Sequence, residues 1–168
     1  ADVLETATRS FGINHPLTLL TQGHLAAAYF MQSNYEKAIE LFSEILKSQT
    51  KIRTFDDSTI LTVQNNMAMS YVKIGKQEEA LELYSEALYV AADKLGVDHP
   101  LVVATESNLA SLHFNMGKLK AALSLYSKVL ERRRESLGDY HPLTVATKLK
   151  IVSVLESLGR PVYGDVCW

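Results

Sequence analysis

The sequence has a single cysteine, little net charge and no long apolar segment. Because Cys167 is the only cysteine, no disulfide can form within the 168 residues, which is compatible with a reducing compartment. The longest uninterrupted apolar run, residues 25–31, is too short to cross a bilayer. The formal net charge of −2 argues against a general nucleic-acid surface, which requires a basic excess. We therefore expect neither membrane insertion nor nucleic-acid binding.

Patterns that would indicate catalysis or a cofactor are also missing. The sequence contains no glycine-rich phosphate loop and no grouping of a nucleophile with a base. Gly75, Gly117 and Gly159 recur at one fixed spacing, which suits turns between helices. The single basic run, residues 132–134, lies between two glutamates and is expected to form a solvated helix face. We expect a protein that is not an enzyme and has no cofactor.

What the sequence does contain is a repeat of 42 residues. The ladder that shows it consists of His15-Pro16, His99-Pro100 and His141-Pro142, with Asp57-Ser58 in the missing place. A fixed period of this size, with helical spacing of apolar residues inside each unit, is typical of stacked repeat proteins. Such proteins present extended concave surfaces to another molecule. The repeat therefore favours a binding function over catalysis.

Each repeat unit is predicted to contain two helices, termed A and B. In the unit from 58 to 96, apolar residues follow helical spacing on both sides of Gly75, and Gly96 ends the second helix. The register predicts A helices at about 16–32, 58–74, 100–116 and 142–158, and B helices at about 2–11, 35–53, 77–95 and 119–137. Proline is expected at the first position of the A helices. Asp57 is expected to cap the helix that follows it.

The register begins inside one unit and ends after half of another. We therefore expect a repeat array over residues 1–159, a separate tail over residues 160–168, and a chain that is a fragment of a longer protein. The final helix A is expected to act as a cap of the array.

The spacing resembles that of the tetratricopeptide repeat, which places Leu-Gly and Tyr on helix A and Ala and Phe on helix B. These elements recur at Leu25-Ala26, Tyr29, Ala38 and Phe42, and again at Met67-Ala68, Tyr71, Ala80 and Tyr84. In the third unit His113 takes the tyrosine's place and is expected to pack in the core. The pattern Leu-Gly-x-x-His-Pro at 95–100 and 137–142 is similar to the kinesin light chain type. The resemblance implies an all-α solenoid of antiparallel helix pairs, wound into a right-handed superhelix.

The resemblance also implies that A-helix side chains line a concave groove and contact an extended peptide. The groove residues that we expect to bind are His24, Phe30, Asn65, Asn66, Met69, Lys73, Asn108, Ser111, Phe114, Asn115 and Lys150. Asn66 and Asn108 are the main candidates, because an amide has both a donor and an acceptor and can pair with any peptide main chain. The alternative is that both amides bond only neighbouring helices or water.

The predicted groove also has a charge and apolar character. Lys73, Lys150 and His24 give it a positive tilt, which favours an acidic partner segment, and Phe30 and Phe114 offer apolar anchor sites. A partner helix lying in the groove is an alternative ligand. The sequence therefore predicts a peptide-binding scaffold in the cytoplasm, and kinship with kinesin light chains would make the partner a cargo adaptor.

Other readings of the same features remain. Exposed apolar residues such as Val3 and Leu4 would suit self-association, and the chain would also suit a regulatory part of a larger enzyme. A metal site at His15, His99 and His141 is rejected. Ligands converge within about 2 Å of one ion, whereas equivalent positions of stacked helices lie about 8–10 Å apart. These histidines are expected to cap helices instead.

Overall fold

The computed structural model describes residues 2–52 and 55–159, and the side chains of residues 3–49 and 55–159. The predicted tail at 160–168, including Cys167, lies outside the described residues. The chain divides into two compact units, of which unit 1 runs to Lys94 and unit 2 begins at Leu95. None of the described helices is both long and apolar enough to cross a membrane.

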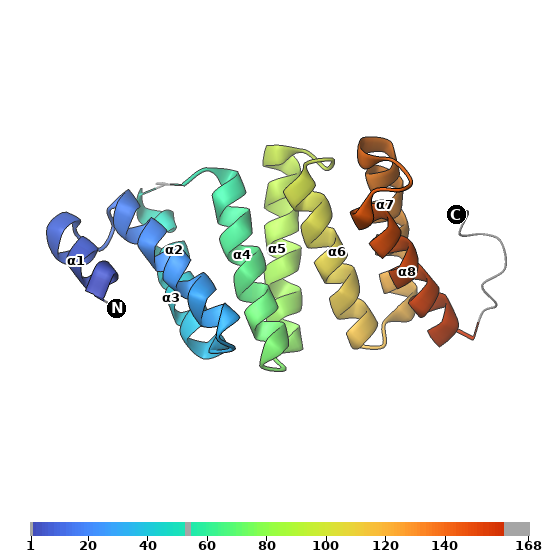
Figure 1. Ribbon diagram of the computed structural model, residues 1–168, viewed down its shortest axis with the longest axis horizontal. Coiled ribbons are helices and arrows are strands. Elements are labelled where there is room, and N and C mark those ends of the chain that lie inside the picture. Colours follow the sequence, from blue (N-terminus) through green and yellow to red (C-terminus); the bar gives the residue numbers. More distant parts are fainter. Residues whose placement is uncertain (1, 53–54, 160–168) are drawn as a thin grey trace. The chain divides into compact units, whose positions relative to one another are not determined.

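Within the described residues, regular structure is entirely α-helical (Figure 1). Unit 1 contains α1 (Asp2–Phe11), α2 (Pro16–Met31), α3 (Tyr35–Ile52), α4 (Asp57–Lys73) and α5 (Gln77–Leu95), the last of which ends at the unit boundary. Unit 2 contains α6 (Pro100–Asn115), α7 (Leu119–Leu137) and α8 (Pro142–Ser157). Every predicted helix is present, and its ends agree with the prediction to within one residue.

Small residues let the two helices of a pair approach closely in both units. In unit 1, Ala26 of α2 and Ala38 of α3 are fully buried beside Phe42, and Leu83 of α5 packs against the same core. In unit 2 the equivalent residues, two periods later, are Ala110, Ala122 and Tyr126, and all belong to one buried cluster. The repeat in the sequence is therefore a repeat of the core.

The histidines of the His-Pro ladder cap their helices. The Nδ1 atoms of His15, His99 and His141 accept hydrogen bonds from backbone N–H groups two residues later, at 3.3, 3.2 and 3.2 Å. Each histidine has extended backbone angles, and a proline occupies the first helical position after it. The expectation that these histidines cap helices is confirmed.

The cap of α4 is not the residue that the ladder predicts. Asp56, not Asp57, is the N-cap, and its Oδ1 accepts the backbone N–H of Thr59 at 2.7 Å. Asp57 is already the first residue of the helix. Because no proline follows to fix the first helical position, α4 can begin one residue before the ladder position.

The basic run of α7 is exposed only at Arg134, so the prediction of a solvated face is wrong for Arg132 and Arg133. Arg132 forms an ion pair with Glu106 of α6, and Arg133 is buried with 8% of its surface exposed. The Nη1 atom of Arg133 donates to the carbonyl of Leu143 at 3.1 Å and to the hydroxyl of Thr147 at 2.8 Å. Arg132 and Arg133 therefore connect α7 to α6 and to α8. The charge pattern of one helix does not indicate such contacts with its neighbours.

Candidate functional site

The predicted groove side chains are all on A helices, and they divide between the two units. Unit 1 holds His24 and Phe30 on α2, and Asn65, Asn66, Met69 and Lys73 on α4. Unit 2 holds Asn108, Ser111, Phe114 and Asn115 on α6, and Lys150 on α8. Each unit therefore carries its own set of candidate contacts.

In unit 1, the side chain of Asn66 is half-buried. The backbone carbonyl of Asn66 accepts the Ser70 hydroxyl at 2.8 Å, but its side chain makes no hydrogen bond to another described residue. The neighbouring Asn65 places its Nδ2 atom 3.7 Å from the sulfur of Met69, one turn later on the same helix. The amide donor and acceptor of Asn66 are therefore not engaged by another described residue.

The predicted aromatic anchors are partly used by the cores. Phe30 packs against the buried cluster of unit 1, and its ring meets the ring of Tyr35 edge-on with centroids 5.3 Å apart. Phe114 packs against the buried cluster of unit 2. Both rings remain half-buried, whereas the side chains of His24, Lys73 and Asn115 are exposed. Each aromatic ring therefore packs against the core on one side and leaves part of its surface exposed.

In unit 2, two predicted residues meet across the A helices. The Nζ atom of Lys150 on α8 donates to the hydroxyl oxygen of Ser111 on α6 at 3.0 Å. The same ammonium lies 5.4 Å from the centroid of the Tyr126 ring, and the Tyr126 hydroxyl lies 2.7 Å from the Ser111 hydroxyl. These three side chains, from three helices, form a contiguous group that we term the Lys150 cluster.

The electrostatic environment of Lys150 is unfavourable to its charge. Burial lowers the pKa of Lys150 below its usual value, and repulsion by Arg133 lowers it further. Two other cations of unit 2 are paired with carboxylates, since Lys148 lies 3.0 Å from Asp139 and Arg132 pairs with Glu106. Among the described residues, no carboxylate forms an ion pair with Lys150.

The sequence did not identify Tyr126 as part of the site. The 42-residue register assigns Tyr126 to the core, at the place held by Phe42 and Tyr84 in the earlier repeats. The residue is indeed buried. The only signal available in the sequence is that one repeat combines a tyrosine, Tyr126, with a serine, Ser111, at these two places. Ser111 stands where the two earlier A helices have Ala27 and Met69, and the last A helix has Ser153 at the same place.

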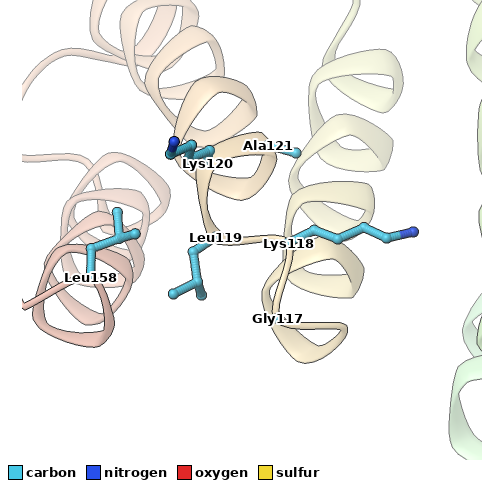
Figure 2. Close-up of a pocket in the computed structure, with 6 residues that line it drawn as sticks. All are labelled: Gly117, Lys118, Leu119, Lys120, Ala121 and Leu158. Atoms are coloured by element: carbon cyan, nitrogen blue, oxygen red, sulfur yellow. The ribbon is translucent and has the colours of Figure 1, made fainter.

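A separate cavity of about 500 Å³ opens at the turn between α6 and α7 (Figure 2). Its lining consists of Gly117, Lys118, Leu119, Lys120, Ala121 and Leu158. Figure 2 shows the Lys118 side chain extending away from Leu158, with the Leu119 side chain between them. None of the predicted groove residues lines this cavity, which is distinct from the Lys150 cluster.

A grouping of metal-ligating side chains was not found in the part of the chain that the structure describes.

Comparison with known proteins relates the fold to repeat proteins. A family model of the tetratricopeptide repeat matches residues 1–51, 59–113 and 101–161. The chain is similar to TPR-like repeats assigned to a kinesin light chain of Podosopora anserina. A substituted form of these repeats has 25% identity and a TM-score of 0.79, with 94% of this chain and 74% of that chain covered. A second structure of them has 24% identity and a TM-score of 0.77, with 94% and 75% covered.

A third solved structure has the same fold at lower identity. BtubC (BKLC) of P. vanneervenii is 19% identical with a TM-score of 0.77, and the match covers 94% of this chain and 62% of that chain. No protein of curated function matches the sequence.

Proposed function

The chain belongs to the tetratricopeptide repeat family, and we propose that its A helices bind a short segment of a partner protein. It is an all-α solenoid of antiparallel helix pairs with repeats of the kinesin light chain-like type. Repeats of this family act as scaffolds for protein–protein interaction, and stacked repeats expose extended surfaces for that purpose. The proposal adds that the ligand is an extended peptide and that no chemical step follows binding.

The observation that carries the proposal is the half-buried amide of Asn66. A half-buried amide that makes no hydrogen bond to another described residue can offer its donor and acceptor to a peptide main chain. Asn108 occupies the equivalent place one period later. Main-chain recognition of this kind tolerates many ligand sequences, so neighbouring side chains must supply the specificity. The half-buried rings of Phe30 and Phe114 would contact apolar anchors of the peptide.

The proposed partner is a cytoplasmic protein with a segment that combines apolar and acidic residues. The kinesin light chain-like repeats favour a cargo adaptor as the source of this segment. Each unit has a lysine on an A helix, Lys73 in unit 1 and Lys150 in unit 2, and either charge would favour an acidic segment.

The test is selection from a displayed library of random peptides. Wild-type protein should enrich a set of peptides, and the double variant Asn66→Ala, Asn108→Ala should lose most of them while keeping its circular dichroism spectrum. Asn14→Ala, which removes an exposed amide from the turn before α2, is the matched control and should keep them. A double variant that retains the same peptides with the same affinity would move binding away from these amides.

Self-association is the second candidate function. It is favoured by apolar residues that remain exposed at the start of the chain, such as Val3 at 71% and Phe11 at 54%. Mass measured as a function of concentration separates it from peptide binding. A constant monomer mass would remove the second candidate, and a dimer weakened by Val3→Asp would support it.

A further inference from the structure

We propose that residues 160–168 are the first turns of a further helix B, which packs on α8 beside the cavity that Leu158 lines. This inference is independent of the peptide binding proposed above. It makes α8 an inner helix of the array, in place of the cap that the register alone suggested. The support comes from the turn after α8, the open face of α8, the register of the residues after Gly159, and the cavity.

The turn that follows α8 has the backbone geometry of the turns that lead into a helix B. Gly159 has a φ of 67°, and Gly117 and Gly75, one and two periods earlier, have 72° and 80°. The N–H group of each glycine donates to the carbonyl three residues earlier, at 3.0, 3.0 and 3.2 Å. Helices α7 and α5 begin two residues after their glycines. The same step after Gly159 reaches Pro161, and proline is favoured at the first position of a helix.

One face of α8 is open at a place where the earlier A helices are closed. The residue at this place in α2, α4 and α6 is Ala26, Ala68 and Ala110, and each is 0% exposed. In α8 it is Val152, which is only half-buried. Ala110 belongs to one buried cluster with Ala122 of α7, so a helix B contributes to burial at this place. The end of a repeat array requires a polar outer face, whereas α8 presents a valine there.

The residues after Gly159 repeat two buried places of helix B. Gly164 stands where the earlier B helices have alanine, and Trp168 stands where they have an aromatic ring. The earlier residues are Ala38, Ala80 and Ala122, each 0% exposed, and Phe42, Tyr84 and Tyr126, each at most 2% exposed. Positions four residues apart lie on one helix face, so Gly164 and Trp168 would face α8 together. The sizes are complementary, because the larger Val152 on α8 is matched by the smaller Gly164.

The cavity lies where such a helix would begin. Leu158 lines it together with residues 117–121, at the turn between α6 and α7 (Figure 2). Pro161 and Val162 follow Leu158 within four residues, which span at most about 14 Å when extended. Both side chains are apolar and therefore within reach of the cavity. Removal of apolar surface from water is the main attraction between packed elements, so it favours docking of this segment over its solvation.

The experiment uses two probes that the sequence itself supplies. Trp168 is the only tryptophan and Cys167 is the only cysteine, and both lie in the proposed helix. Tryptophan emission moves to shorter wavelength when the ring leaves water, so native Trp168 should emit at shorter wavelength than in urea and be quenched several-fold less by acrylamide. Cys167 takes the place of three leucines that pack against the cores, Leu41, Leu83 and Leu125. Its thiol should therefore react several-fold more slowly with Ellman's reagent in the native state.

Two substitutions of Gly164 form a matched pair. Gly164→Ala supplies the residue that the other B helices have, and it should keep both probes protected. Gly164→Leu adds bulk where α8 approaches, and it should move the emission towards that of the protein in urea. Because both substitutions remove glycine, a change in backbone freedom does not explain a difference between them. On α8, Val152→Asp should expose the probes, whereas Ser153→Asp at the exposed neighbouring position should not.

The outcomes are distinct, with circular dichroism showing that each variant keeps its helices. Probes that are protected in the wild type and exposed by Gly164→Leu and Val152→Asp, but not by the two control variants, support the inference. An emission in native buffer equal to that in urea would overturn it. Protection that disappears on dilution would assign the cover of α8 to a second copy and also overturn it. Protection that is lost with Asn108→Ala and kept with Val152→Asp would place the segment in the groove instead.

Discussion

The hydroxyl groups of Ser111 on α6 and Tyr126 on α7 lie 2.7 Å apart, and either can be the donor. Tyr126 is 2% exposed, so its hydroxyl group depends on protein partners for hydrogen bonding. Burial raises the pKa of Tyr126, and the bond to Ser111 opposes this rise. Tyr126→Phe should lower the free energy of unfolding by about 1 kcal/mol, the usual net worth of one hydrogen bond. Urea denaturation measures this loss of stability, provided that the slope of unfolding free energy against urea concentration is the same for both proteins.

Tyr84→Phe is the matched control for that substitution. Tyr84 occupies the equivalent place one period earlier and is 1% exposed, and its hydroxyl makes no hydrogen bond to another described residue. The control should change the stability less than Tyr126→Phe does. Equal losses for the two substitutions would show that the Ser111 contact adds nothing.

Lys150→Met should leave the folded state at least as stable as the wild-type protein. The ammonium is half-buried without a carboxylate, whereas a methionine keeps the apolar contacts of the stem. Binding and stability would therefore respond in opposite directions, as expected for a residue kept for function. Chemical denaturation at neutral pH checks this, and a loss above about 1 kcal/mol would mean that the ammonium is structural.

Lys150→Met should also change how the unfolding free energy depends on pH. Because burial and Arg133 lower the pKa of Lys150 in the folded state, the folded protein binds this proton less tightly than the unfolded chain. The wild-type protein should therefore gain stability from this group as pH rises from the folded pKa towards the usual value of 10.5. The difference in unfolding free energy between Lys150→Met and wild type should narrow over that alkaline range. A constant difference would contradict the cause assigned to the shift.

The period of the sequence predicted the helices well, because every unit repeats the same core residues. Ala26 and Ala110 hold the same place two periods apart, and both are fully buried. Periodicity was less successful where one unit departs from the others. It placed the cap of α4 at Asp57, although without a proline the helix begins there and Asp56 caps it.

The Lys150 cluster shows why the candidate site was only partly predictable. Lys150 and Ser111 were both expected at groove positions, but nothing in the spacing indicated that they touch. Their contact depends on how α6 and α8 are rotated about their axes against α7, which also decides that the Tyr126 hydroxyl reaches Ser111. Periodicity gives the face of a helix on which a side chain lies, whereas a hydrogen bond between helices depends on packing to within about 1 Å.

Asp56→Ala should destabilise the protein more than Asp57→Ala. Asp56 accepts the backbone N–H of Thr59 at 2.7 Å, and this bond lowers the pKa of its carboxyl below 3.8. Its stabilising contribution is therefore present above pH 3.8 and is lost as pH falls through the folded pKa. Asp57 is the first residue of α4 and favours the helix only through its charge near the N-terminus. Thermal unfolding of both variants at pH 7 compares them, and equal melting temperatures would reject the assignment of the cap.

His113→Tyr should stabilise unit 2 and reduce its sensitivity to mild acid. His113 is half-buried, and its buried Nδ1 atom has no hydrogen-bond partner among the described residues. Burial lowers the pKa of His113 below 6.5, and the charge of Lys118 lowers it further. The contribution of this group to stability is therefore complete above pH 6.5 and is lost as pH falls through the folded pKa. A tyrosine does not titrate in this range and removes the unpaired nitrogen.

The repeat itself supplies the precedent for this substitution. Tyr71 occupies the equivalent place in unit 1, where Lys76, five residues later, lies 6.0 Å from the ring centroid. Lys118 has the same offset from His113, so its cation should stabilise a tyrosine ring where it now opposes protonation of an imidazole. Unfolding free energies measured between pH 7.5 and 5.5 should fall for the wild type, fall less for Lys118→Gln, and fall least for His113→Tyr. At pH 7 the tyrosine variant should be more stable by about 1 kcal/mol. An acid dependence that is unchanged by His113→Tyr would assign it to other groups.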